Sequence, residues 1–199
     1  PFDPATEDFA RSYAGLTADA LGADIQCVAW SGLGVVRNFD VEPSPTLLER
    51  HRYANPVSKS DWDVSLWSPD VVVVNLGSND FYRLPPPDPD HFRGALAGFI
   101  EAALRRAPQA RIVLLDGPLL KDGFPIDDTG RALPSLTTVR GHLDAVAARF
   151  PAGTVHRLSF TSATPERGYG ADWHPNLAQH RLNADELIDF LNRQVLPGI

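Results

Sequence analysis

Apolar residues recur along the chain with helical spacing in some segments and as short unbroken runs in others. Near the amino terminus, four apolar side chains are separated by four, three and four residues, which predicts an amphipathic helix. They are Phe9, Tyr13, Leu16 and Ala20. The next segment, residues 24–30, is short and mostly apolar, so it predicts a strand.

The rest of the chain continues this alternation of helix and strand. Residues 71–74 form a β-branched run without polar alternation, which is typical of a strand buried on both faces of a parallel sheet. Further strands are predicted at 111–115 and 155–158, with helices at 47–53, 92–104, 136–150 and near the carboxyl terminus. The apolar faces of the last three helices are Phe92, Leu96, Phe99, Ile100 and Leu104; Val139, Leu143 and Val146; and Leu187, Ile188 and Leu191. This alternation predicts an α/β fold with a parallel sheet covered by helices on both faces.

Length and composition fit one globular domain over residues 1–199. Hydrophobic residues make up 43% and charged residues 22%, which are ordinary globular values, and the sequence has no internal repeat. The net charge of -7 argues against nucleic acid as a partner, because phosphate binding requires clustered Lys and Arg. No segment is apolar over the length of a membrane span, so a membrane is not expected as a partner either.

Candidate metal ligands lack the spacing of known sites. Cys27 is the only cysteine, so the chain has neither an internal disulfide nor a cysteine-based metal site. Asp122, Asp127 and Asp128 lie in a polar loop but without the ordered spacing of an EF-hand. The remaining histidines share no ligand spacing: His51, His91, His142, His156 and His180. We therefore expect no metal and no other cofactor.

The first candidate for chemistry follows the valine run at 71–74. That strand ends in a Gly-Ser-Asn-Asp turn, and in α/β sheets ligands bind beyond the carboxyl ends of the strands. Asn79 lies in this turn, and its amide is a neutral N–H donor suited to stabilising negative charge on a carbonyl oxygen during acyl transfer. The alternative is a purely structural turn, because all four residue types are common turn formers.

The second candidate lies in a Gly-rich segment ahead of the last helix. Asp172 and His174 are two residues apart, so in an extended backbone their side chains point to the same side. Pro175 disfavours a helical conformation at His174. A carboxylate beside an imidazole fixes its tautomer and stabilises the imidazolium that forms when the ring accepts a proton. Alternatively, Asp172 caps a turn and His174 only packs; Trp173, between them, is the best aromatic candidate for contacting a substrate.

Three motifs in a fixed order give the chain a family resemblance. AWSGLGVVRNF follows the predicted strand at 24–30, NLGSND follows the valine run, and DWHPN precedes the last helix. This order resembles the SGNH, or GDSL-type, hydrolase superfamily. Within it, WSGLGVVRN and YGADWHPN are most similar to carbohydrate esterase family two, the acetyl xylan esterase type. The resemblance covers nearly the whole chain, and the three motifs together are far more specific than any one.

The resemblance implies a fold and a set of site residues. The fold would be a three-layer α/β/α, flavodoxin-like arrangement with a parallel sheet. Gly32 matches the oxyanion glycine of the superfamily, with Gly34 as the nearby alternative, and Asn79 matches the oxyanion asparagine. His174 and Asp172 match the general base and its orienting acid.

The superfamily motif that carries the nucleophile, a Gly-Asp-Ser after the first strand, has no counterpart in this chain. The sequence opens with a stretch that resembles the residues just after that motif, so we expect the serine and its strand upstream of Pro1. The strand should lie between the predicted strands at 24–30 and 71–74, and residues 1–199 alone should be inactive and poorly stable. Ser31 and Ser78 are weak internal candidates, because each belongs to another motif and neither lies in a Gly-x-Ser-x-Gly elbow.

The resemblance further implies a secreted serine esterase that removes O-acetyl groups from plant cell wall polysaccharides such as xylan and glucomannan. The partner would be an acetylated polysaccharide or oligosaccharide. Two alternatives stay open, namely a non-catalytic glycan-binding module and an esterase or thioesterase for lipid-type acyl groups. The pairing of Asp172 with His174 favours an enzyme, and the sequence contains no indication of an oligomeric state.

Overall fold

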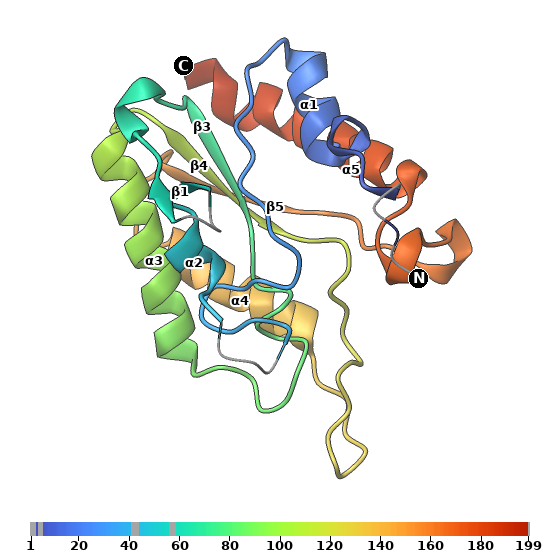
Figure 1. Cartoon of the computed structure of the whole chain (residues 1–199). Coiled ribbons are helices and arrows are strands. Elements are labelled where there is room, and N and C mark those ends of the chain that lie inside the picture. Colours follow the sequence, from blue (N-terminus) through green and yellow to red (C-terminus); the bar gives the residue numbers. More distant parts are fainter. Residues whose placement is uncertain (1–2, 4–5, 41–43, 56–58, 199) are drawn as a thin grey trace. The chain divides into compact units, whose positions relative to one another are not determined.

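The computed structural model of the chain describes residues 3, 6–40, 44–55 and 59–198. From β3 to α5, strands and helices alternate along the sequence (Figure 1). They are α1 (Tyr13–Leu21), α2 (Leu47–Arg50), β1 (Tyr53–Asn55), β2 (Ser60–Asp61), β3 (Val71–Asn75), α3 (Pro89–Arg106), β4 (Arg111–Asp116), α4 (Ser135–Ala147), β5 (Val155–Ser159) and α5 (Leu177–Phe190). The chain divides into a first unit (Pro1–Cys27, Gly117–Leu119, Leu158–Ile199) and a second unit (Val28–Asp116, Leu120–Arg157).

Strands β3, β4 and β5 form one sheet, in that order. β3 and β4 run parallel, with Val71 opposite Arg111 and Asn75 opposite Leu115. β1 and β2 form a separate, short antiparallel pair. The predicted α/β fold with parallel strands is therefore confirmed, as are the predicted strands at 111–115 and 155–158.

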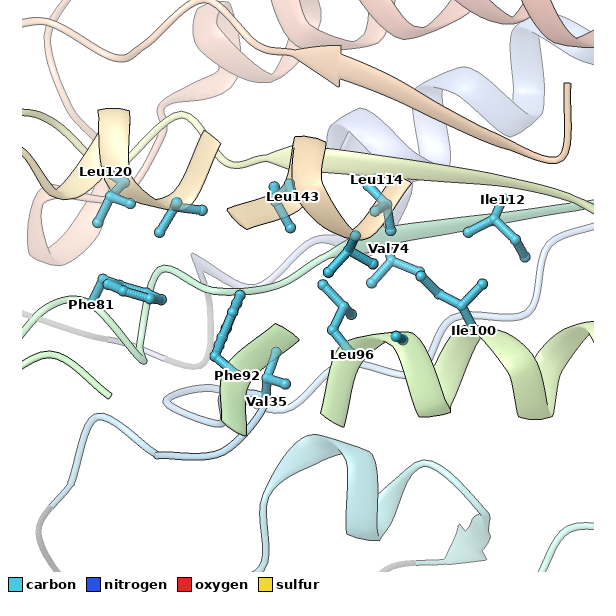
Figure 2. Packing of buried hydrophobic residues seen from close by; sticks show 13 residues of the cluster. Val35, Val74, Phe81, Phe92, Leu96, Ile100, Ile112, Leu114, Leu120 and Leu143 are labelled. Atoms are coloured by element: carbon cyan, nitrogen blue, oxygen red, sulfur yellow. The ribbon is translucent and has the colours of Figure 1, made fainter. Parts of the chain in front are cut away.

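The core of the second unit lies between the sheet and helices α3 and α4 (Figure 2). Its members share near-complete burial: Phe92, Leu96 and Ile100 from α3, Leu143 and Val146 from α4, and Val74, Ile112 and Leu114 from the strands. Both helices bury the apolar faces predicted from their spacing. This packing holds the carboxyl end of β3, and the turn that follows it, against the core.

Helix α3 has sequence signals at both ends. The Asp88 side chain accepts a hydrogen bond from the N–H of His91 at 2.8 Å and so caps the first turn. Pro89 is the first helical residue, where its missing N–H has no intrahelical partner to lose. Arg105 and Arg106 lie in the last turn, where positive charge favours the helix dipole. Every described helix of the chain is too short or too polar to span a bilayer.

The predicted strand at residues 24–30 is wrong. The described segment is not paired with any strand, and its apolar side chains face solvent, with Ile25 45%, Val28 51% and Trp30 44% exposed. The Cys27 side chain is also exposed. A strand requires a hydrogen-bonded neighbour, and the apolar pattern of the segment alone does not supply one.

The prediction that strand β3 is buried on both faces is wrong. It lies at the edge of the three-stranded sheet, and only Val74 of its five residues is buried, while Val73 is 38% exposed. In the described part of the chain, the side of β3 opposite β4 has no neighbouring strand. The valine run of β3 therefore forms an open edge of the sheet. Proteins usually cover such an edge.

In the first unit, α1 packs along α5. The Tyr13 ring meets Phe160 edge-on at 5.1 Å, and the Tyr13 N–H donates to Nδ1 of His180 at 3.2 Å. Burial lowers the pKa of His180, which keeps its ring neutral and Nδ1 available as an acceptor. The half-buried imidazole thus satisfies an N–H group that the first turn of α1 leaves without a helical partner.

The predicted apolar face of the first helix is right for Tyr13 and Leu16, which are half-buried, and wrong for Phe9 and Ala20. Ser12 caps α1 by accepting from the Gly15 N–H at 3.3 Å, so the α-helix begins after Phe9 rather than near it. Phe9 is 46% exposed and Ala20 is exposed. The buried residues of α1 are Gly15, Thr17 and Ala18. At Gly15, an added Cβ atom would lie 2.4 Å from the carbonyl oxygen of Phe9, so this position requires glycine.

A buried ion cluster joins β4, α4 and β5. The Asp116 carboxylate, with its side chain 1% exposed, contacts Arg140 at 2.9 Å and Arg157 at 3.0 Å. Arg157 also contacts Asp144 at 2.8 Å, but the Asp144 side chain is 65% exposed. Arg157 therefore pairs with one buried and one solvated carboxylate. Replacing each carboxylate in turn compares how a buried and an exposed ion pair contribute to stability.

We expect Asp116→Ala to lower the free energy of unfolding by about 3–5 kcal/mol, because it leaves the largely buried Arg157 guanidinium, whose side chain is 16% exposed, without its buried carboxylate. Asp144→Ala is the matched control and should cost less than about 1 kcal/mol, as exposed ion pairs do. Urea unfolding of both variants, each compared with the unchanged protein, measures the difference. Equal losses in the two variants would contradict a structural role for the buried cluster.

Candidate active site

The turn after β3 places Asn79 against the loop of residues 31–39, which is called the glycine loop below. The Phe81 N–H donates to the Gly77 carbonyl at 3.2 Å and closes the turn. Nδ2 of Asn79 donates to the main-chain oxygen of Leu33 at 2.9 Å. An amide nitrogen carries two hydrogens, so this bond leaves the second one for a ligand. In the second unit, the structure thus brings Asn79 next to the loop that contains Gly32.

Gly32 and Gly34 differ in how their N–H groups are used. Within the described residues, the Gly32 N–H has no protein acceptor, while its carbonyl accepts from the Phe39 N–H at 2.7 Å. Its φ of 78° lies in the left-handed region that favours glycine. The Gly34 N–H instead donates to Oδ1 of Asn38 at 3.1 Å. This geometry favours Gly32 over Gly34 as an oxyanion donor.

Asp80 is a functional candidate that was not predicted from the sequence. Its side chain is fully buried, and the carboxylate accepts hydrogen bonds from the N–H groups of Val35, Val36 and Arg37 at 2.9, 2.8 and 3.0 Å. Burial raises the pKa of the Asp80 carboxyl, and the three N–H bonds and the Arg37 guanidinium oppose that rise. In the sequence, Asp80 is one of four turn-forming residues, and no local pattern marks it as an anchor for a distant loop.

His174 lies in the first unit, in the loop ahead of α5. Its φ of -70° and ψ of 165° are extended, as predicted for the residue before Pro175. The residues before it form a tight 3₁₀ turn, Ala171–Trp173, with φ of 46° at Asp172 and 63° at Trp173. The predicted extended backbone from Asp172 to His174 is therefore wrong.

Main-chain carbonyl groups orient the His174 imidazole. Its Nδ1 lies 2.9 Å from the carbonyl oxygen of Asp172 and 3.2 Å from that of Ala171. Carbonyl oxygens only accept hydrogen bonds, so Nδ1 carries a hydrogen, and in the neutral form of the ring the lone pair is on Nε2. In the described part of the chain, Nε2 has no hydrogen-bond partner. A neutral ring held in this tautomer is suited to accept a proton from a hydroxyl group.

The Asn176 side chain connects the loop that contains His174 to helix α5 by hydrogen bonds. Oδ1 of Asn176 accepts from the Gln179 N–H at 2.9 Å and caps the helix, while Nδ2 donates to the Arg167 carbonyl at 2.8 Å. The Gly170 N–H donates to the His174 carbonyl at 2.7 Å. These hydrogen bonds connect the segment around His174 to Arg167 on one side and to helix α5 on the other.

Ser31 and Ser78 gain no base from their own unit. Ser31 is exposed and Ser78 is half-buried, and no described histidine of the second unit is hydrogen-bonded to either. An activated serine needs a base within hydrogen-bond reach. The structure therefore adds no support for either serine.

Three half-exposed aromatic rings form a row beside the glycine loop. Phe39 and Tyr82 lie 4.9 Å apart between ring centroids, and Tyr82 and Phe124 lie 5.0 Å apart. The row starts at the glycine loop, because Phe39 is hydrogen-bonded to Gly32. Sequence reasoning missed it, since the three rings come from three separate segments.

Trp173, the aromatic residue predicted to contact substrate, lies in the first unit and is 77% exposed. Its ring meets Tyr169 edge-on at 5.6 Å. A ring with this exposure has most of its surface free for a ligand.

The carboxylates of Asp122 and Asp127 accept hydrogen bonds from nearby main-chain N–H groups. Oδ1 of Asp127 accepts from the N–H groups of Thr129 and Arg131, both at 2.9 Å, and Asp122 accepts from the Thr137 N–H at 2.9 Å. Across the described ranges, no group of three or more His, Cys, Asp or Glu side chains is arranged to hold a metal ion.

Comparison with known proteins identifies relatives of the chain. Residues 2–182 match the GDSL-like lipase/acylhydrolase family model. The chain is 35% identical over 189 residues to cellulase/esterase CelE of Acetivibrio thermocellus, covering 94% of this chain and 22% of that protein. It is 36% identical over 199 residues to an acetylxylan esterase / glucomannan deacetylase of Cellvibrio japonicus, covering 95% of this chain and 51% of that protein. The chain thus spans about half, or less, of the length of these relatives.

A solved structure shares the fold over the whole chain. The family two carbohydrate esterase from Clostridium thermocellum, in complex with cellohexaose, matches 100% of this chain with a TM-score of 0.85 and 33% identity, and 58% of that structure is covered. The expected SGNH hydrolase fold is therefore confirmed. By this match and the family match over residues 2–182, the chain belongs to the GDSL-like lipase/acylhydrolase family, and its relatives there are carbohydrate esterases of family two.

Proposed function

We propose that the protein is a serine esterase that removes O-acetyl groups from cell wall polysaccharides such as xylan and glucomannan. The observation that carries the proposal is the position of the His174 ring, whose Nδ1 lies 2.9 and 3.2 Å from two main-chain carbonyl oxygens while Nε2 has no partner among the described residues. Asn79 and Gly32 supply two neutral N–H donors, the kind of group that stabilises an oxyanion. A base and oxyanion donors are the parts that acyl transfer needs beside a nucleophile.

The reaction proceeds in two steps. The serine oxygen attacks the acetyl carbonyl carbon and gives its proton to Nε2 of His174, while Asn79 and Gly32 bind the oxyanion. The bond to the sugar oxygen then breaks, and the imidazolium returns the proton to that oxygen, which leaves an acetyl-serine. Water attacks this ester with His174 as the base again, and the step releases acetate and restores the serine.

The serine comes from a strand upstream of Pro1 that pairs with the open edge of β3. Support comes from the exposed Val73 side chain and from the absence, in the described residues, of a strand on that side of β3. Parallel strands end at the same edge of a sheet, so such a strand would present the serine at the edge where Asn79 lies.

The aromatic rings support a carbohydrate substrate. Sugar rings have apolar C–H faces that pack on aromatic side chains, and the row of Phe39, Tyr82 and Phe124 starts at the oxyanion loop. Trp173 adds an exposed ring beside the base. Because acetylated wall polysaccharides lie outside the cell, an extracellular location follows from this substrate. The row would equally serve a glycan-binding module, so esterase activity itself decides between the two functions.

We expect Asn79→Ala in the full-length protein to lower kcat on 4-nitrophenyl acetate by about a hundredfold to a thousandfold, the effect of losing one oxyanion donor. Asn192→Ala, on the exposed surface after α5, is the control and should leave kcat unchanged. Steady-state kinetics of both variants measure the effect. An unaltered kcat in Asn79→Ala would remove this amide from the mechanism.

If main-chain carbonyls orient His174, the variants His174→Ala and Asp172→Asn should differ strongly in kcat. His174→Ala should reduce kcat by at least about ten-thousandfold, because the base is lost. Asp172→Asn should stay within about tenfold of the unchanged enzyme, since its carbonyl remains and asparagine tolerates a positive φ. The measurement is kcat on the same aryl acetate. A drop of about ten-thousandfold in Asp172→Asn would instead make the carboxylate the orienting group.

Variants of the aromatic row test the class of substrate. Phe39→Ala and Tyr82→Ala should each raise KM for acetylated xylan or glucomannan by roughly twofold to tenfold, as expected for the loss of about 0.5–1.5 kcal/mol of ring packing. Neither should change KM for 4-nitrophenyl acetate, which has no sugar chain. A preference of the unchanged enzyme for long-chain aryl esters, with no effect of these variants on the polymer, would support the lipid-type esterase.

A further inference from the structure

Asp80 forms an unusual link between the two parts of the oxyanion site. Its neighbour in the sequence, Asn79, is one proposed donor, while its own carboxylate holds the glycine loop that carries the other donor, Gly32. One peptide bond therefore connects the amide of Asn79 to the group that fixes the glycine loop.

The glycine loop is gathered around this carboxylate. Oδ2 of Asp80 accepts from Val35, and Oδ1 accepts from both Val36 and Arg37, so three successive N–H groups point at one side chain. A carboxylate that is 0% exposed must have such partners, because an unsatisfied buried charge is very costly. The loop conformation that satisfies Asp80 is thus strongly preferred over its alternatives.

The surrounding contacts leave the loop little freedom. The Arg37 guanidinium donates to the main-chain carbonyls of Asp80 and Arg83, which ties the loop to the turn a second time. At Gly34, an added Cβ atom would lie 2.5 Å from Oδ2 of Asp80 and 2.0 Å from the Arg37 carbonyl oxygen. Gly34 is therefore required for close packing around the carboxylate, which explains its place in the loop without a role as a donor.

We propose that Asp80 is a positioning residue, which sets the direction of the Gly32 N–H relative to the Asn79 amide and thereby preorganises the oxyanion site. This role rests on the proposed esterase function. It does not involve contact with substrate, so the expected loss is in transition-state stabilisation and not in substrate binding. A displacement of about 1 Å in such a group can cost about a hundredfold in rate.

The test compares two buried carboxylates in the full-length protein. In Asp80→Asn, an NH₂ group replaces one acceptor oxygen and faces the main-chain N–H groups, so kcat on 4-nitrophenyl acetate should fall by about a hundredfold while KM changes less than about twofold. Asp116→Asn is the control, because Asp116 is about equally buried but its ion-pair partners, Arg140 and Arg157, are not residues of the glycine loop. It should lower the thermal midpoint and leave kcat unchanged.

A second variant covers the case in which Asp80→Asn does not fold. Gly34→Ala keeps the carboxylate but displaces it from the loop, and it should show the same loss in kcat with an unaltered KM. Methylboronic acid, which forms a tetrahedral adduct with a catalytic serine, should inhibit both variants more weakly by the same factor as kcat falls.

The outcomes separate this role from the proposed function. An active wild-type enzyme whose Asp80→Asn variant keeps its kcat, or loses activity only through KM, would overturn the positioning role alone. A loss of kcat no larger than that of Asp116→Asn would do the same. A wild-type protein without activity on any ester would overturn the esterase function, and the positioning role with it.

Discussion

The burial of the Asp80 carboxylate is the constraint on which the geometry of the glycine loop and of the turn at Asn79, the proposed oxyanion site, depends. A buried charge must be hydrogen-bonded, and in this chain its partners come from a loop more than forty positions earlier in the sequence, at Val35, Val36 and Arg37. The core beneath makes this constraint rigid, since Val35 packs in the same cluster as Val74 of β3 (Figure 2). Strand β3, the turn after it and the glycine loop are therefore held together as one rigid segment of the second unit.

The proposed base, His174, is oriented by main-chain groups. The carbonyl oxygens of Ala171 and Asp172 lie next to its Nδ1, and the positive φ at Asp172 and Trp173 directs the Asp172 carbonyl at Nδ1. Backbone strain of this kind persists only where the surroundings fix it, as the Asn176 bonds do here. The orientation of the ring thus depends on the conformation of the loop.

The sequence predicts the elements whose stability is local or follows from one apolar face. Helices α3 and α4 are recognised because their buried residues recur at helical spacing, and β4 because it is an apolar run in the sheet interior. Residues 24–30 have a similar apolar content but lack a pairing partner, which no local pattern reveals. For the site, motif order indicates Gly32, Asn79 and His174, whereas Asp80 and the row of Phe39, Tyr82 and Phe124 arise from tertiary contacts between distant segments.

The most direct test of the proposed esterase is to find the residue that a serine-reactive fluorophosphonate labels in the full-length protein. We expect a single adduct on a serine upstream of Pro1, located by peptide mass spectrometry, and we expect His174→Ala to abolish the labelling because the base no longer activates the hydroxyl. An adduct on Ser31 or Ser78, or labelling that is equally fast without His174, would contradict the assignment of nucleophile and base.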